Sequence, residues 1–312
     1  MPDDAPPVLG PSAAWKNFDG RDAVQYFDSL PGTEERLLER IAGAEVVVNI
    51  RSSTRFTPPV FERSPALRLL SIWGTGTDNV DLEAAARHGV TVTNTPGVSA
   101  TSIAEHALAL MLAVARRIPR LDSQTRAGEW PRGQMTQLQG KTLGIIGLGA
   151  IGRKFARLGA GIGMRVIAWT MHPDPSLGFA LVDLDDLLQS SDVVSLHLRL
   201  SDQTRGFLGA REFALMKSSA ILINTARGAI VDEAAMIDAL RSNRLAGAGL
   251  DVFAVEPIPA NHALLESANV VLTPHAAGIT VEALEAGLQL ALDNVRNFLA
   301  GRPTNVVITA SR

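Results

Sequence analysis

Cysteine is absent from the 312-residue sequence, and so are long hydrophobic runs and long basic runs. The lack of cysteine excludes disulfides, thiolate nucleophiles and cysteine-based metal sites. The longest uncharged apolar run, residues 107–115, is too short to span a bilayer and is typical of a buried helix. A formal net charge of −3 without a basic run disfavours a nucleic-acid surface. We therefore expect no metal site, no nucleic-acid partner and no membrane partner.

The N-terminal residues, MPDDAPPVLGP, differ from a signal peptide in charge and in hydropathy. They contain acidic residues and four prolines, where a signal peptide has positive charge followed by an apolar core. We expect this segment to be a poorly ordered arm. Together with the lack of cysteine, it favours a cytoplasmic protein.

Predicted strands and helices alternate along the chain, whose length suggests two domains. Strands at 45–50, 67–73 and 90–94, with helices at 33–43 and 81–88, predict a first parallel sheet covered on both faces. A second alternating set follows residue 142. Its further strands are predicted at 165–169, 193–197, 220–224, 247–252 and 270–273, and its helices at 184–190, 210–215 and 233–242.

The end of the chain predicts one long helix and one short strand. The helix extends from about Val281 to Ala300, with Thr280 as a candidate N-cap and Gly301 after its end. The strand follows at 305–308. We expect this C-terminal segment to return to the first domain.

The segment Thr142–Gly152, TLGIIGLGAIG, matches a dinucleotide-binding fingerprint. Gly147, Gly149 and Gly152 fit the G-x-G-x-x-G pattern. These glycines allow a tight turn, the approach of a pyrophosphate to the backbone, and close packing of helix on strand. A strand–helix turn without a ligand is the alternative. The apolar run before the motif and the helical pattern after it favour a nucleotide site.

Three chemically active side chains follow predicted strands after residue 220. Arg227 follows the strand at 220–224, Glu256 the strand at 247–252, and His275 the strand at 270–273. Each alone has an ordinary alternative: a surface arginine, a solvated loop carboxylate or a structural histidine. Because open α/β sheets bind ligands at the carboxyl ends of their strands, this strand-end trio predicts a site.

The strand-end trio suits the interconversion of a 2-keto acid and a 2-hydroxy acid. Histidine transfers protons near neutral pH, and a carboxylate bonded to it fixes its tautomer. Arginine binds a substrate carboxylate and stabilises charge on the neighbouring oxygen. A nicotinamide cofactor supplies or accepts the hydride.

In these motifs the chain resembles the D-isomer-specific 2-hydroxyacid dehydrogenase family, which includes phosphoglycerate dehydrogenase and glyoxylate/hydroxypyruvate reductases. The matching residues extend over nearly the whole chain, from about Val46 to Val306. They occur in the family's order. They are GTGTDNVDL at 74–82, NTPG at 94–97, AEH at 104–106, GLGAIG at 147–152, NTARG at 224–228, DVF at 251–253, EP at 256–257 and TPH at 273–275.

The resemblance implies roles for single residues. Arg227 would bind substrate, His275 would be the acid/base, and Glu256 would be the partner of His275. The Gly74–Gly76 loop would hold the substrate carboxylate through backbone N–H groups. Arg51 would add charge there, with a solvated arginine as an equal alternative. The residues assigned to substrate are Arg51, Gly74, Thr75, Gly76, Arg227 and His275. Those assigned to the cofactor are Gly147, Gly149, Ala150, Ile151, Gly152, Thr170, His197, Thr225, Ala226, Arg227, Asp251, His275, Ala277 and Gly278.

The resemblance also implies an α/β fold of two doubly wound parallel-sheet domains. A Rossmann cofactor domain, residues 104–284, would be inserted in a flavodoxin-like substrate domain made of residues 1–103 and 285–312. Family members pair as homodimers through the cofactor domain. The segment 126–132 matches a region that reaches the partner, so Trp130 could approach the partner's site, with ordinary packing as the alternative.

The chain departs from the dinucleotide fingerprint at one position. An acid about twenty residues after the glycines normally binds the adenosine ribose, and Thr170 stands there instead. Threonine does not repel a 2′-phosphate, but no arginine follows in the loop, and Arg153 and Arg199 are the nearest candidates. The expected cofactor is therefore NAD or NADP, without a stated preference.

The function predicted from the sequence is an NAD(P)-dependent oxidoreductase. It would transfer a hydride between the cofactor and a small 2-keto acid or D-2-hydroxy acid, with glyoxylate and hydroxypyruvate as first substrates to test. The alternative is a nucleotide-sensing interaction protein on the same fold, like the co-repressors that resemble this family.

Overall fold

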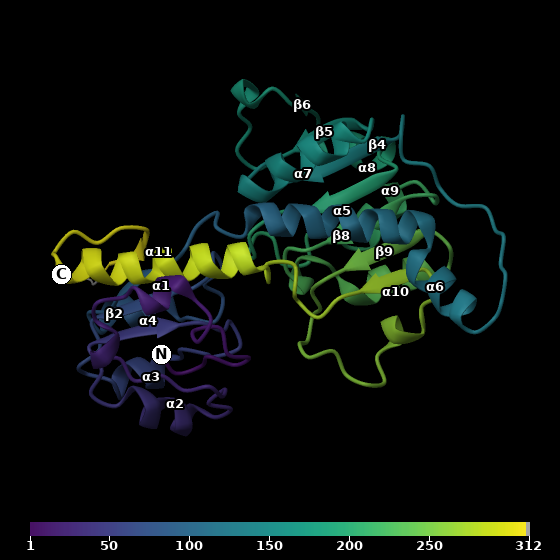
Figure 1. Ribbon diagram of the computed structural model, residues 1–312. Helices are drawn as coiled ribbons and strands as arrows, with labels where there is room; N and C mark the ends of the chain where they lie inside the picture. Colours follow the sequence, from purple (N-terminus) through teal and green to yellow (C-terminus); the bar gives the residue numbers. More distant parts are fainter. Residues whose placement is uncertain (310–312) are drawn as a thin grey trace. The chain divides into compact units, whose positions relative to one another are not determined.

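The computed structural model describes residues 1–309, and its chain divides into two compact units (Figure 1). The central unit comprises Ala100–Gly278. The discontinuous unit comprises Met1–Ser99 together with the chain from Ile279 onward. Both boundaries fall a few residues before the predicted ones at 103/104 and 284/285.

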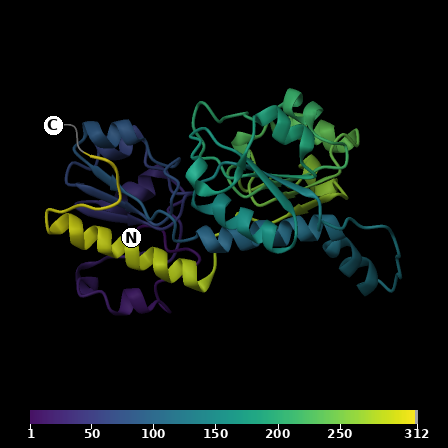
Figure 2. The same cartoon turned by 90° about the horizontal axis from the view of Figure 1, so that it is seen from above.

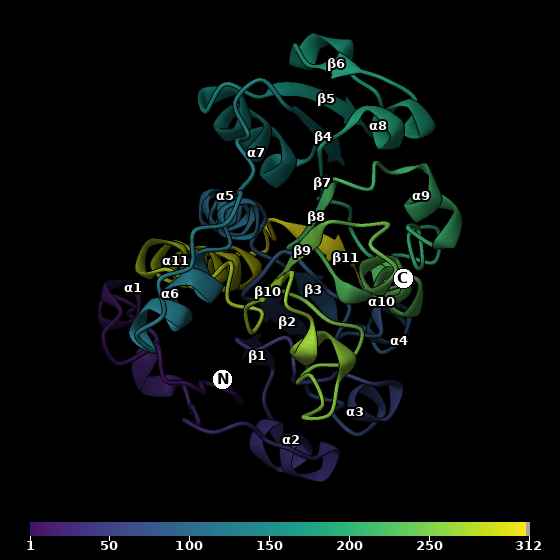
Figure 3. The ribbon, with the colours of Figure 1, turned by 90° about the vertical axis from the view of Figure 1, so that its right-hand side faces the viewer.

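The central unit is built on a seven-stranded parallel sheet in the order β10-β9-β8-β7-β4-β5-β6. Figure 3 shows this order from β6 to β10. The chain starts at β4, moves outward to β6, then crosses to β7 and moves outward in the other direction. The switch point of this doubly wound sheet therefore lies between β4 and β7. The strands are β4 (Thr142–Ile146), β5 (Arg165–Trp169), β6 (Ala180–Leu181), β7 (Val193–Leu196), β8 (Ile221–Asn224), β9 (Gly247–Leu250) and β10 (Val270–Leu272).

Strand β4 is buried on both faces, as its continuous apolar sequence predicts. Leu143 and Ile145 pack in one apolar cluster and Ile146 in another, because successive side chains of a strand point to opposite faces. The first cluster includes residues of α5 and α7, and the second includes residues of α8, α9 and α10. The helices of this unit are α5 (Ala100–Arg116), α6 (Ile118–Arg126), α7 (Ala150–Gly161), α8 (Leu184–Ser190), α9 (Ala210–Leu215) and α10 (Glu233–Arg241), with short 3₁₀ turns at Pro175–Leu177, Gly228–Ile230 and Ala263–Glu266.

Helix α5 contains the apolar run 107–115. Its residues Ala107, Leu110 and Met111 are buried. The helix packs on α7 and on the sheet of the central unit. Over residues 1–309, no helix combines the length and the apolar content needed to cross a membrane.

The discontinuous unit has a four-stranded sheet in the order β1-β2-β3-β11, parallel except for the edge strand β11. Helix α11 packs against β2, and the Thr280 hydroxyl accepts the N–H of Ala283 as the expected N-cap. Figure 2 shows α11 lying along this sheet. The pairing of β11 with β3 confirms that the C-terminal segment returns to the first sheet. The elements are α2 (Glu34–Ile41), β1 (Val46–Asn49), α3 (Pro58–Glu62), β2 (Leu69–Ile72), α4 (Leu82–Arg87), β3 (Thr91–Thr93), α11 (Val281–Leu299) and β11 (Val306–Ile308).

The N-terminal segment is packed, so the expectation of a poorly ordered arm is wrong. Asp3 and Asp4 are 0% and 1% exposed. Leu9 and Phe18 bury their side chains in a cluster with residues of α11, and the short helix α1 (Ala13–Lys16) lies against α11. Burial of the apolar side chains and the backbone hydrogen bonds to the two carboxylates stabilise this segment in spite of its prolines and charges.

Candidate active site

The glycine turn between β4 and α7 needs glycine at two positions for steric reasons. Gly147 has a φ of 100°, and a Cβ there would lie 2.8 Å from the carbonyl oxygen of His197. A Cβ on Gly152 would lie 2.0 Å from the carbonyl oxygen of Gly147. Any larger residue at either position would force the turn open.

The N-terminus of α7 is suited to an anion. No side chain caps this helix at Gly149, and a Cβ built on Gly149 would meet nothing within 4 Å. The first N–H groups, including those of Ala150 and Ile151, therefore face no capping side chain, and the helix dipole favours negative charge there. The turn also lies at the switch point of the sheet. It has the shape and polarity that a pyrophosphate requires.

The end of β5 lies beside the glycine turn, because the Gly147 N–H donates to the Trp169 carbonyl oxygen at 2.8 Å. Thr170 follows directly and is half-buried. The acid of this loop is Asp174. The hydroxyl and N–H of Ser176 donate to its carboxylate and, with the charge of Arg153, lower its pKa.

The His197 side chain is turned into the protein interior. Its Nε2 lies 2.9 Å from the Ser195 hydroxyl oxygen, and its ring is 5.4 Å from the ring of Phe155. Burial lowers the pKa of His197 to about 3, so the imidazole is neutral. Its backbone carbonyl oxygen lies against the glycine turn at Gly147.

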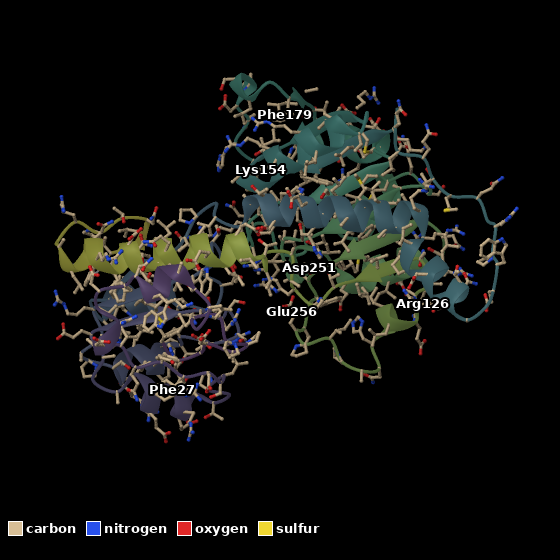
Figure 4. The ribbon with its side chains drawn as sticks, viewed as in Figure 1. Phe27, Arg126, Lys154, Phe179, Asp251 and Glu256 are labelled. Carbon is tan, nitrogen blue, oxygen red and sulfur yellow. The ribbon has the colours of Figure 1, made fainter. Side chains whose placement is uncertain are left out.

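The strand-end trio lies at the carboxyl edge of the central sheet, where β8, β9 and β10 are neighbours. His275 Nδ1 and Glu256 Oε2 are 2.7 Å apart. The second oxygen, Glu256 Oε1, accepts the N–H of Phe253 at 3.0 Å. The Arg227 guanidinium donates to the Ala226 carbonyl oxygen at 2.8 Å. Glu256 and the nearby Asp251 are labelled in Figure 4.

Glu256 is ionised at neutral pH. Burial by itself raises the pKa of its carboxyl. The hydrogen bonds from His275 and Phe253 and the charges of His275 and Arg227 outweigh burial, so the pKa of Glu256 falls below its ordinary value of 4.5. The carboxylate thus binds Nδ1 of His275 and leaves the other ring nitrogen, Nε2, outside this hydrogen bond. The His275 and Glu256 side chains are each 35% exposed, which leaves the pair accessible to a small molecule.

Asp251 is 1% exposed and holds the turn that carries His275. Its Oδ1 accepts the Thr273 hydroxyl at 2.6 Å and the Ala276 N–H at 2.9 Å, and its Oδ2 accepts the Ala277 N–H at 2.9 Å. The His275 N–H donates to the Asp251 carbonyl oxygen at 2.8 Å. Four hydrogen bonds therefore support His275 at a φ of 52°, a conformation uncommon for residues other than glycine.

Gly228 lets the Arg227 loop approach the Glu256 loop. A Cβ on Gly228 would lie 2.0 Å from the carbonyl carbon of Phe253 and 2.5 Å from the nitrogen of Ala254. Only glycine permits this approach of two backbones. The contact joins the segments that carry two members of the trio.

The substrate residues predicted at 51 and 74–76 belong to the discontinuous unit, after β1 and β2. The Gly74 N–H donates to the Thr95 hydroxyl oxygen at 2.8 Å, so it is already engaged. Within residues 1–309, the N–H groups of Thr75 and Gly76 donate to no protein acceptor. Of the three predicted residues, Thr75 and Gly76 are thus the two whose N–H groups have no protein acceptor in the described chain.

Comparisons with known proteins agree with this geometry. The family model for the D-isomer specific 2-hydroxyacid dehydrogenase, NAD binding domain, matches residues 108–277. Glyoxylate reductase of Aeropyrum pernix is 41% identical over 299 residues, which cover 91% of this chain and 89% of the relative. D-3-phosphoglycerate dehydrogenase of Methanocaldococcus jannaschii is 38% identical over 283 residues, covering 88% of this chain and 54% of the relative. The solved structure of an acyclic imino acid reductase in complex with NADPH and D-Arg has a TM-score of 0.88 and 30% identity, covering 98% of this chain and 99% of that chain.

The chain belongs to the D-isomer-specific 2-hydroxyacid dehydrogenase family. As a member of this family it is an oxidoreductase, and its residues 108–277 match the family's NAD binding domain.

The residues of this 2-hydroxyacid dehydrogenase fit a dinucleotide. Because Gly149 has no Cβ, the space beside its backbone is open, and no protein atom lies within 4 Å of the position that a Cβ would take. Helix α7 also begins there without a side-chain cap. The Thr225 hydroxyl oxygen is buried and has no hydrogen-bond partner within the described chain. It lies in the Thr225–Arg227 segment that the resemblance assigns to the cofactor. A buried hydroxyl without a partner is costly, and a bound polar group would remove that cost.

Sequence reasoning gave no role to two residues of this site, His106 and Thr273. His106 Nε2 lies 2.9 Å from the Thr273 hydroxyl oxygen and 3.5 Å from Asp251 Oδ1. Because the Thr273 hydroxyl donates to Asp251, His106 must donate to Thr273. Both residues lie in motifs that the chain shares with the family, AEH at 104–106 and TPH at 273–275, and these motifs could have indicated a role for them.

Gly152→Ala should weaken the binding of NADH or NADPH at least about tenfold, because the added methyl would overlap the Gly147 carbonyl oxygen. Titration of cofactor fluorescence measures this. Gly161→Ala, in the same helix with nothing within 4 Å of its Cβ, is the matched control and should bind as the wild type does. Equal affinities for the two variants would contradict the close contact in the turn.

Proposed function

We propose that this dehydrogenase reduces short 2-keto acids to D-2-hydroxy acids with NADH or NADPH. In the reverse direction it oxidises the D-2-hydroxy acids with NAD⁺ or NADP⁺. The His275–Glu256 hydrogen bond of 2.7 Å, in reach of the Arg227 charge, carries this proposal. The name of the relative from Aeropyrum pernix, a glyoxylate reductase, supports glyoxylate as the first substrate to test.

The proposed mechanism assigns one task to each member of the strand-end trio. When bound, a reduced nicotinamide would supply the hydride to the carbonyl carbon of the substrate. His275 donates a proton from Nε2 to the substrate's carbonyl oxygen, which becomes the hydroxyl. The Glu256 carboxylate stabilises the protonated imidazole before that transfer. Arg227 pairs with the substrate carboxylate and stabilises negative charge on the neighbouring oxygen.

We further propose that the central unit is the cofactor domain and the discontinuous unit the substrate domain. The open glycine turn supports the first assignment. The N–H groups of Thr75 and Gly76 support the second, since two adjacent backbone donors can bind a carboxylate.

His275→Ala should lower kcat for glyoxylate reduction about 10²- to 10⁴-fold while cofactor affinity is kept, because proton transfer is lost. Glu256→Gln removes the negative charge beside Nδ1 and should move the alkaline limb of the reduction rate about one pH unit lower. Steady-state rates across a pH series, with both reduced cofactors and a panel of 2-keto acids, measure both effects.

The control for these variants is His262→Gln. His262 also faces a carboxylate, with Nε2 3.0 Å from Glu233 Oε1, but it does not belong to the trio. Its pH–rate profile should match that of the wild type. An unchanged profile in the Glu256 variant would refute the pairing. No turnover of any 2-keto acid by the wild type would favour the nucleotide-sensing interaction protein.

Thr170→Asp should lower kcat/KM for NADPH at least about tenfold and keep that for NADH, because a carboxylate beside the ribose repels a 2′-phosphate. Thr170→Ser keeps the hydroxyl and is the control. The comparison of both cofactors in each variant measures the effect. A wild type that strongly prefers NAD would show that Thr170 does not admit the phosphate.

We also propose a homodimer formed through the central unit. Helix α6 has no buried residue, and Trp130, in the segment after it, is 76% exposed. Figure 1 shows this segment running away from the sheet of the central unit. Light scattering should give about twice the chain mass of 33.1 kDa. A mass equal to that of one chain would refute the homodimer.

The cytoplasmic location stays a prediction.

A further inference from the structure

One carboxylate ties the N-terminal segment to the loop that follows β1. Asp3 Oδ2 accepts the Asn49 side-chain amide at 2.5 Å and the Arg51 N–H at 3.0 Å. Asp3 Oδ1 accepts the Ile50 N–H at 2.9 Å. The residue is fully buried. Three consecutive residues at the carboxyl end of β1 therefore depend on one acidic side chain.

Asn79 extends this network to the loop that follows β2. Its side-chain amide donates to Asn49 Oδ1 at 2.9 Å and to the Thr54 carbonyl oxygen at 2.8 Å. The backbone carbonyl oxygen of Asn79 accepts the Phe56 N–H at 2.8 Å. Asn79 lies three residues after Gly76. A continuous hydrogen-bonded path thus leads from Asp3 to the loop that offers the N–H groups of Thr75 and Gly76.

The N-terminal segment is held in place by contacts that do not involve these loops. The Asp4 carboxylate accepts the N–H groups of Val8 and Leu9 at 2.8 and 3.3 Å. The Asp4 N–H donates to the Phe27 carbonyl oxygen at 2.8 Å, and Arg40 donates to the Pro2 carbonyl oxygen at 2.6 Å. Phe27 is labelled in Figure 4. The segment is therefore a fixed support from which Asp3 reaches the loop.

Arg51 is held by the same segment. Its guanidinium donates to the Pro6 carbonyl oxygen. Burial lowers the pKa of Arg51, and the charges of Asp4 and Asp3 act against that change. The side chain is thus held at the Pro6 carbonyl oxygen and is not a freely solvated arginine.

We propose that Asp3 is a positioning residue for substrate binding, acting through Asn49 and Asn79 on the loops 50–55 and 73–79. The proposal rests on the function proposed above, because that function places the substrate carboxylate at Thr75 and Gly76. Asp3 touches neither substrate nor cofactor. It sets the backbone that presents those donors, so its loss changes substrate affinity more than turnover.

The test uses the full chain with Asp3→Asn, which keeps the side-chain size but cannot present two acceptor oxygens. The KM for glyoxylate should rise about tenfold, while kcat and the dissociation constant of the cofactor stay within about twofold. Asn79→Ala, at the far end of the path, should raise the KM in the same way. It keeps the proposal testable where Asp3→Asn fails to fold.

The matched control is Asp4→Asn, a neighbouring buried carboxylate that accepts N–H groups only within its own segment. It should lower thermal stability and leave the KM unchanged. Equal KM values for the Asp3 and Asp4 variants, or a wild-type KM in Asn79→Ala, would overturn the proposal.

Hydrogen exchange separates this proposal from the proposed function. Amides of residues 49–55 and 73–79 should exchange at least about tenfold faster in Asp3→Asn or Asn79→Ala than in Asp4→Asn. A wild type without turnover of any 2-keto acid refutes the function, while the exchange rates still decide the positioning. Exchange rates equal to those of the Asp4 variant refute the positioning itself.

Discussion

The site depends most on the buried carboxylate of Asp251. A charge 1% exposed to water is stable only where donors surround it, and here the Thr273 hydroxyl and the N–H groups of Ala276 and Ala277 do so. Those donors all belong to the turn that carries His275. The need to satisfy one buried charge therefore fixes the backbone of a residue that itself remains accessible. A side chain whose backbone is held in this way needs no further ordering to present its ring.

Close backbone contacts are the second constraint, and glycine is the only residue that meets them. Gly152 lies against the Gly147 carbonyl, and Gly228 lies against the backbone at Phe253 and Ala254. The first contact shapes the turn at the switch point of the sheet. The second joins the Arg227 loop to the Glu256 loop. The glycine turn and the strand-end trio thus rely on the same property, which is the absence of a side chain where two backbone segments meet.

Much of the fold was predictable because local periodicity and tertiary packing agree. The strand at 165–169 and the helices at 184–190 and 210–215 were predicted with the bounds observed. The pairing of Glu256 with His275 also followed from strand ends that share one sheet edge. Short elements such as α3 and β6 were missed, because a few residues carry too little periodic pattern. The role of His106 was missed for another reason: only its partner Thr273, 167 positions away, distinguishes it from the other histidines.

The structure of the N-terminal segment could not be predicted from its local composition. Its prolines and acids predict disorder, yet Asp3 and Asp4 are buried because backbone donors distant in sequence reach them. Tertiary contacts also pair the Gly74 N–H with the Thr95 hydroxyl and bring the His197 imidazole to the Ser195 hydroxyl.

The sequence by itself determined the doubly wound architecture, the glycine turn and the identity of the strand-end trio, since each rests on spacing along the chain. Only the tertiary structure decided which polar groups are already paired and which remain open to a ligand. Hydrogen bonds between distant segments make that choice, and no pattern of neighbouring residues records them.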